Sequence, residues 1–214
     1  MLEPTGLADL SRQRDALVRE VHHRIKNHLH GVMGLLRVQA DAHADLAPHL
    51  IEVMGQVGAI AGVYGLQGTG AHPGADLGEV VRLIATVAAG PVDCEGLAAT
   101  PLPLADVDAV PVALVVNELV ANALKHREGP DPVRPVRLAL ERTGEGARLT
   151  VSAGPARLPQ GFDFAARRGL GTGLALAATL LPSRGARLDF LQDGDEVRAV
   201  LTLEPPILST PDPG

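Results

Sequence analysis

The sequence predicts an α+β protein, in which an N-terminal hairpin of two helices precedes a domain with helices on one face of a largely antiparallel sheet. Three observations predict this fold. Two long stretches, residues 7–43 and 47–66, carry apolar residues at helical three-four spacing. The rest of the chain mixes shorter helical patterns with strand patterns. A glycine-rich segment, residues 65–74, lies between the two parts and is typical of a flexible linker.

The two N-terminal helices carry apolar seams that a single hairpin cannot bury. The seam of the first helix consists of Val18, Val21, Ile25, Leu29, Val32 and Leu36. The seam of the second consists of Leu46, Leu50, Val53, Val57, Ile60 and Tyr64. We therefore expect two chains to pair as a homodimer around a four-helix bundle. The alternative is a hairpin that packs on its own C-terminal domain.

The C-terminal part is predicted to contain three helices and five strands. Asp76, with Glu79 three residues later, resembles a capping box for the first helix, and Pro111 suits the first turn of the second. The expected helices span residues 77–89, 110–126 and 172–182. The expected strands span residues 91–95, 134–142, 147–153, 186–192 and 196–203.

These elements divide the chain into four parts. They are a helical hairpin (1–66), a linker (67–75), a mixed α/β domain (76–204) and a proline-rich tail (205–214) that we expect to be disordered.

Composition excludes several classes of protein. The formal net charge is −6 and there is no basic block, which argues against a nucleic-acid-binding protein. The single cysteine, Cys94, excludes an internal disulfide framework. No signal peptide is recognised, and no apolar run approaches the roughly 20 residues of a membrane span. We therefore expect a cytoplasmic protein without direct membrane insertion.

The two adjacent histidines of the first helix are predicted to face different surroundings. At about 100° per residue, His23 points roughly 155° away from the apolar stripe, whereas His22 lies only about 60° from it. His23 is thus expected to face solvent, in line with Glu20 and Asn27. An exposed imidazole with a carboxylate one turn away is a candidate nucleophile. The alternative is an ordinary surface histidine.

The helix at residues 110–126 carries a second group of polar side chains. Glu118, Asn122 and Lys125 cluster about 145° from its apolar face, which predicts a carboxylate, an amide and an ammonium on one open surface. An amide oxygen is a suitable ligand for Mg²⁺, and an ammonium balances phosphate charge. An amphipathic surface helix without a ligand is the alternative.

A glycine run comes before the helix at residues 172–182. Gly169, Gly171 and Gly173 leave backbone N–H groups uncovered at a helix start, which favours anion binding. Arg167 and Arg168 just before the run could add charge-assisted hydrogen bonds to phosphate. The alternative is a flexible loop between a strand and a helix.

Taken together, these segments resemble sensor histidine kinases of the HisKA_2 type. The run His22-His23-Arg24-Ile25-Lys26-Asn27-His28-Leu29 resembles the phosphoacceptor box of that family. The run from Val116 to His126 resembles the N box of GHKL ATP-binding domains, and the run from Gly169 to Leu174 resembles their second glycine box. The order and spacing fit over roughly residues 10–204.

The resemblance implies a helical hairpin that forms a four-helix bundle on dimerisation, followed by a GHKL/Bergerat-like α/β sandwich. It implies that His23 accepts phosphate from ATP and passes it to an aspartate of a response-regulator receiver domain. Asn122 would coordinate the Mg²⁺ of the nucleotide, and Glu118 would activate water or polarise the acceptor. It also assigns nucleotide contacts to Asn117, Lys125, His126, Gly169, Gly171 and Gly173.

One motif of the family is degenerate. Where the first glycine box Asp-x-Gly-x-Gly is expected, Ala153 stands at the adenine-binding aspartate, and Pro155 and Arg157 stand at glycines. Losing one hydrogen bond to a charged partner costs roughly 1.5–3 kcal/mol, or about 10- to 150-fold in affinity. We therefore expect weakened ATP binding.

This departure leaves two other readings open. One is an ATP-independent histidine phosphotransferase, in which His23 relays phosphate between receiver domains beside a vestigial ATPase domain. The other is a GHKL scaffold that only binds partners. These 214 residues contain no recognisable sensory domain, so we expect the signal to come from an upstream sensor domain or a partner protein.

Overall fold

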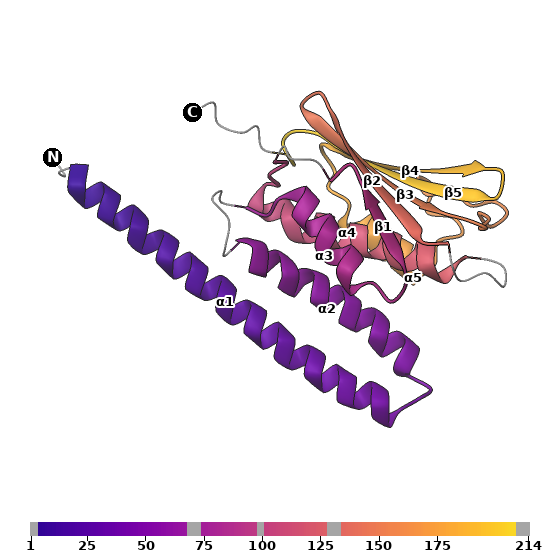
Figure 1. Cartoon of the computed structure of the whole chain (residues 1–214), viewed down its shortest axis with the longest axis horizontal. Helices are drawn as coiled ribbons and strands as arrows, with labels where there is room; N and C mark the ends of the chain where they lie inside the picture. Colours follow the sequence, from indigo (N-terminus) through magenta and orange to yellow (C-terminus); the bar gives the residue numbers. More distant parts are fainter. Residues whose placement is uncertain (1–3, 68–73, 98–100, 128–133, 209–214) are drawn as a thin grey trace.

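The computed structural model describes residues 4–67, 74–97, 101–127 and 134–208 (Figure 1). Its helices are α1 (Pro4–Ala42), α2 (Ala47–Gln67), α3 (Leu77–Val87), α4 (Asp106–Lys125) and α5 (Thr172–Leu180). Its strands are β1 (Val92–Glu95), β2 (Val136–Thr143), β3 (Gly146–Ala153), β4 (Ala186–Asp193) and β5 (Glu196–Leu203). The α+β fold predicted from the sequence is confirmed.

The five strands form one sheet in the order β1-β2-β3-β5-β4. Only β1 and β2 are parallel, and the other neighbours are antiparallel. Figure 1 shows α3, α4 and α5 against one face of this sheet, with α2 beyond them and α1 outermost. Alternation along β2 and β3 turns residues such as Leu138 and Leu149 towards the helices, where they pack into one core with Val116 and Leu119 of α4.

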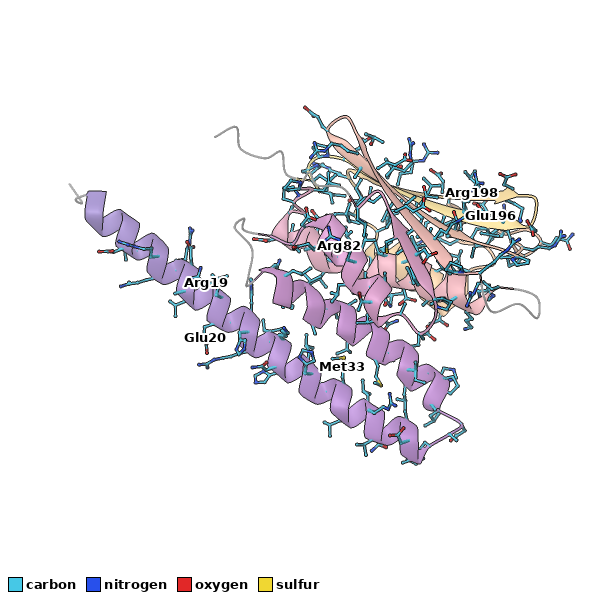
Figure 2. All side chains as sticks on the ribbon, in the orientation of Figure 1. Arg19, Glu20, Met33, Arg82, Glu196 and Arg198 are labelled. Carbon is cyan, nitrogen blue, oxygen red and sulfur yellow. The ribbon has the colours of Figure 1, made fainter. Side chains whose placement is uncertain are left out.

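Helix α2 packs on two sides. On one side it contacts α1, where Met33 lies between the two helices (Figure 2) and its Sδ is 3.6 Å from the position a Cβ would take at Gly58. On the other side it contacts α3 and α4. The hairpin therefore does pack on its own C-terminal domain, through α2. Several seam residues of α1, including Val18, Val21 and Val32, nevertheless remain exposed in the single chain.

One helix start differs from the sequence-based expectation, and one helix cap agrees with it. Helix α4 begins at Asp106, so Pro111 lies inside the helix rather than in its first turn. Asp106 and Asp108 form an acidic first turn that favours this earlier start. At α3 the expected cap is confirmed, because the Asp76 side chain accepts a hydrogen bond from the Glu79 N–H at 3.1 Å.

The expected disordered tail is wrong for residues 205–208. Ile207 and Leu208 are buried in the core, and the Ile207 carbonyl accepts a hydrogen bond from the Ala105 N–H at 2.8 Å. Residues 209–214 lie outside the described residues. Residues 68–73 of the expected linker also lie outside the described residues. At the two ends of that linker, Gln67 is the last residue of α2 and Ala75 is buried.

Helices α2 and α4 are long and apolar enough to cross a membrane, with mean hydropathies of 1.2 and 1.6. By this criterion, the expectation that no segment reaches that length is wrong. The signal is weak, because core helices of soluble proteins meet the same criterion, and in this protein α4 packs under the sheet while α2 packs between α1 and α4.

Candidate functional site

His23 is exposed on α1, as the helical periodicity predicts. Its Nδ1 lies 3.4 Å from the amide nitrogen of Asn27, one turn further along. The Glu20 carboxylate accepts a hydrogen bond from Arg24 Nε at 2.6 Å. That hydrogen bond and the charge of Arg24 hold the pKa of Glu20 below its ordinary value. Glu20 lies one turn from His23, as the sequence analysis placed it, and its carboxylate is bound by Arg24.

An open cleft of about 350 Å³ adjoins His23. Its walls come from α1 and the C-terminal end of α2, and Figure 2 shows Arg19 and Glu20 on the N-terminal half of α1. The lining residues are Ala16, Arg19, Glu20, His23, Lys26, Tyr64 and Gly65. Arg19 and Lys26 make part of this wall cationic, which suits a phosphorylated group or an acidic partner surface.

His22 has a different environment from His23. It is half-buried between α1 and α2, with its ring centroid 5.4 Å from that of Tyr64. Its Nδ1 is buried and has no hydrogen-bond partner within the described parts of the chain. His22 thus lies at the seam, and His23 is the exposed imidazole of the pair.

Glu118 is buried, which the sequence analysis did not predict. Only 2% of the residue is exposed, because α2 and α5 cover this face of α4. Its Oε1 accepts hydrogen bonds from Gln56 Nε2 of α2 at 3.0 Å and from the neighbouring Asn117 Nδ2 at 3.3 Å. The open surface expected from helical periodicity is therefore wrong at Glu118, since periodicity along one helix does not report what packs on its polar face.

The rest of the N-box segment is more accessible. Asn122 is half-buried, whereas Lys125 and His126 at the end of α4 are exposed. His126 is the C-cap residue, and its N–H donates to the Asn122 carbonyl at 3.0 Å. The side-chain oxygen of Asn122 is of the hard type that Mg²⁺ prefers, so this residue fits a metal held jointly with phosphate.

The glycine run lies at the start of α5, beside the N box. Gly171 is the N-cap residue of α5, with open space around it, and Gly173 lies in the first turn. A Cβ at Gly173 would lie 2.3 Å from Glu118 Oε2, so only glycine allows the carboxylate this close. The structure thus brings together two motifs that are far apart in the sequence.

The two arginines before the run are engaged elsewhere. Arg167 Nη2 donates to the Ala178 carbonyl at 2.9 Å, and Arg168 pairs with Asp163 at 3.0 Å. Neither therefore serves as a free phosphate ligand in this arrangement, in contrast to the expectation from the sequence. Gly169 has a φ of +70°, which explains the glycine at that turn.

Hydrogen bonds to the β4–β5 hairpin fix the segment that replaces the first glycine box. Ala153 ends β3 and is buried in the core. Beyond it, the Ala156 N–H donates to the Asp195 carbonyl at 2.8 Å, and the Leu158 N–H donates to Gln192 Oε1 at 2.9 Å. Gln192 Nε2 donates in turn to the Ala156 carbonyl at 3.2 Å. The segment is therefore tied to the hairpin of β4 and β5, and Ala153 offers no side-chain acceptor for an adenine amino group.

Comparisons with known proteins agree with these features. Residues 20–72 match the HisKA_2 family model, described as histidine kinase. The chain is 31% identical over 182 residues to the sensor histidine kinase PdtaS of Mycobacterium tuberculosis, covering 78% of this chain and 35% of that protein. The corresponding protein of Mycolicibacterium smegmatis is 29% identical over 163 residues, covering 71% and 32%. The chain thus spans about a third of the length of these relatives.

The fold is similar to that of solved histidine kinases. The histidine kinase domain of the Erythrobacter litoralis EL346 blue-light activated histidine kinase superposes with a TM-score of 0.59 at 22% identity, covering 91% of this chain and 94% of that domain. Full-length ShkA in complex with AMPPNP superposes with a TM-score of 0.50 at 16% identity, covering 92% and 46%. Residues 20–72 thus belong to the HisKA_2 family of histidine kinases. The chain as a whole is similar in sequence to sensor histidine kinases, and its helical hairpin and mixed α/β domain are similar in fold to histidine kinase domains.

Proposed function

We propose that this chain is the catalytic core of a two-component sensor histidine kinase. His23 accepts the γ-phosphoryl group of ATP and then transfers it to an aspartate of a response-regulator receiver domain. The signal would reach this core through a further domain or a partner protein.

The contact of Glu118 with Gly173 is the observation that supports this proposal most. It joins the N box of α4 to the start of α5, where backbone N–H groups favour an anion. Asn122 and Lys125 follow Glu118 on the same helix, so a nucleotide bound there would meet an amide oxygen and an ammonium. ShkA, a relative in fold, was solved with the nucleotide analogue AMPPNP.

The chemistry assigned to His23 follows from its exposure. The Nδ1 side of the ring is next to Asn27, which leaves Nε2 for attack on the γ-phosphorus. A bond from Nε2 to phosphorus forms while the bond to the bridging oxygen of ADP breaks, and the ring proton passes to solvent. Mg²⁺, when bound with the nucleotide, would neutralise the developing charge, and Lys125 would add to this. The receiver aspartate then takes the phosphoryl group as the phosphorus–nitrogen bond breaks.

We also propose a homodimer formed through the hairpin. Leu17, Val21, Leu35 and Val38 of α1 expose large apolar side chains in the single chain. Pairing two hairpins would remove this apolar surface from water.

Labelling tests the proposal directly. The purified chain is incubated with Mg²⁺ and ATP that carries a labelled γ-phosphate, and acid-labile protein phosphate is measured. A receiver domain is then added. The kinase proposal requires that the chain becomes labelled and that the label then moves to the receiver. A dimeric chain that stays unlabelled with Mg²⁺-ATP contradicts the proposal.

A histidine phosphotransferase is the second candidate. It is favoured by Ala153, which lacks the adenine-binding carboxylate, and by the ties from Gln192 and Asp195 to the degenerate segment. In that case a phosphorylated receiver labels His23, whereas ATP does not.

A further inference from the structure

Helix α2 of the hairpin lies directly on the candidate nucleotide site. Gln56 donates to the Glu118 carboxylate at 3.0 Å. Gly55, one residue earlier, packs against Asn117, whose Oδ1 is 3.6 Å from the position a Cβ would take. Glu52, one turn before Gln56, extends to the start of α5, with Oε1 3.9 Å from the corresponding position at Gly173. Three residues of α2 thus lie next to the N box or the start of α5.

Two carboxylates consequently lie together at the start of α5. Glu118 comes from the catalytic domain, and Glu52 comes from the hairpin. The N-terminus of a helix attracts negative charge, so this is where phosphate oxygens would be expected. Glu118 is almost fully buried by this packing. A triphosphate entering the same space would meet both repulsion and steric overlap with α2.

The shape of α2 favours this close docking. A Cβ at Gly62 would lie 1.9 Å from Leu83 Cδ2 of α3, so a larger residue there would force the Leu83 side chain to move. Gly55 lies next to Asn117 of α4, where a Cβ would be in ordinary van der Waals contact with the amide. The contact between hairpin and catalytic domain therefore includes close packing and a partly buried hydrogen bond to the Glu118 carboxylate.

This docked arrangement also keeps the nucleotide site away from His23. His22 and Lys26 lie beside Tyr64 and Gly65 of α2, whereas Glu118 contacts Gln56. The eight residues from Gln56 to Tyr64 correspond to about 12 Å of helix rise. Helix α2 also stands between α1 and α4 (Figure 1). In this arrangement, phosphoryl transfer to His23 of the same chain would require α2 to leave the N box.

We propose that Glu52 and Gln56 form a latch through which the hairpin closes the nucleotide site, so that α2 docking and Mg²⁺-ATP binding exclude each other. The proposal rests on the kinase function proposed above and adds its regulation. Because the closed form does not bind, the apparent affinity for ATP is reduced by the fraction of molecules that are closed. A signal that shifts the hairpin would raise ATP affinity and free the site to reach His23 in one step.

Matched variants of α2 test the latch. Gln56→Ala removes the hydrogen bond to Glu118, and Glu52→Gln removes the competing charge while keeping the side-chain shape. Gln56→Ala is expected to raise the apparent affinity for Mg²⁺-ATP by about tenfold, the lower bound for one hydrogen bond to a charged group. Glu52→Gln is expected to raise it as well, because it removes a charge that repels the phosphates. The control is Gln67→Ala, which removes the exposed 3.3 Å hydrogen bond from the end of α2 to Asp106 and is expected to leave the affinity unchanged.

Two measurements on the same proteins separate the outcomes. Calorimetry gives the affinity for Mg²⁺-ATP, and hydrogen exchange of the α2 amides reports docking without any nucleotide. Tighter ATP binding together with faster α2 exchange in Gln56→Ala, but not in Gln67→Ala, supports the latch. Equal ATP affinity in parent and latch variants overturns it, even though the kinase function stands. If α2 exchange rises but no variant binds ATP, the latch as a nucleotide gate and the ATP dependence of the proposed function are both overturned.

Discussion

Glu118 and Gly173 are in close contact across α4 and α5, and a Cβ at Gly173 would lie 2.3 Å from Glu118 Oε2. Gly173→Ala is therefore expected to destabilise the fold by about 1–3 kcal/mol, as overpacking of a filled site does. Gly171→Ala is the matched control, because nothing lies within 4 Å of its Cβ position and its φ of −76° suits alanine. Thermal or urea unfolding measures both, and equal stability of the two variants would contradict the close contact.

Replacement of the two histidines separates their roles. His23→Ala is expected to abolish acid-labile phosphorylation, whether the phosphate comes from ATP or from a phosphorylated receiver. His22→Ala is expected to keep most of it, because His22 packs against Tyr64 at the seam and loses only packing. Phosphate analysis of both proteins, with circular dichroism as a folding control, checks this. Full labelling of His23→Ala would assign the phosphate elsewhere.

The role of Asn122 in nucleotide binding is tested by placing a negative charge at its position. Asn122→Asp adds a carboxylate beside the expected triphosphate and changes the ligand chemistry at the metal, so Mg²⁺-ATP affinity is expected to fall by about tenfold or more. Gln39→Glu adds the same charge at an exposed position of α1 and serves as the control. Calorimetry on both variants decides, and an equal affinity would argue against a role for Asn122 in binding.

The dimer proposal is tested on the exposed face of α1. Leu35 is 70% exposed in the single chain, so Leu35→Asp is expected to leave the chain folded but to weaken the dimer by burying an unpaired charge between hairpins. Leu191→Asp, at a residue of β4 that is 54% exposed, is the control. Light scattering at micromolar concentration gives the mass, and a dimer unaffected by Leu35→Asp would move the interface away from this face.

The outer face of the sheet predicts a pH effect on stability. Glu196 accepts hydrogen bonds from Arg198, at 2.7 Å, and from Arg137, and the first of these contributes most to holding its pKa below the ordinary value (Figure 2). A lowered folded-state pKa stabilises the fold at pH above the ordinary carboxyl pKa, and this contribution is lost as the pH falls through the folded value. Glu196→Gln should therefore reduce stability at neutral pH and flatten its decline in acid. Urea unfolding from pH 7 to pH 3 measures this, and parallel curves for both proteins would contradict it.

Much of the fold could be predicted from local patterns. The three-four spacing of apolar residues predicted both helices of the hairpin to within a few residues, and alternation predicted the strands β2 to β5. The exposure of His23 and the position of His22 at the seam also followed, since both depend only on the geometry of one helix. The start of α4 was placed too late, because Pro111 is tolerated inside the helix once an acidic turn precedes it.

The sequence alone thus determined the hairpin, the mixed sheet and the three segments that carry the chemistry. Tertiary structure decided what surrounds them. Helical periodicity predicted that Glu118 is exposed, but α2 and α5 pack over it and bury it between Gln56 and Gly173. Arg167 and Arg168 turn to Ala178 and Asp163 instead of the glycine run. Such contacts join residues far apart in the chain, and no local period encodes which surfaces meet.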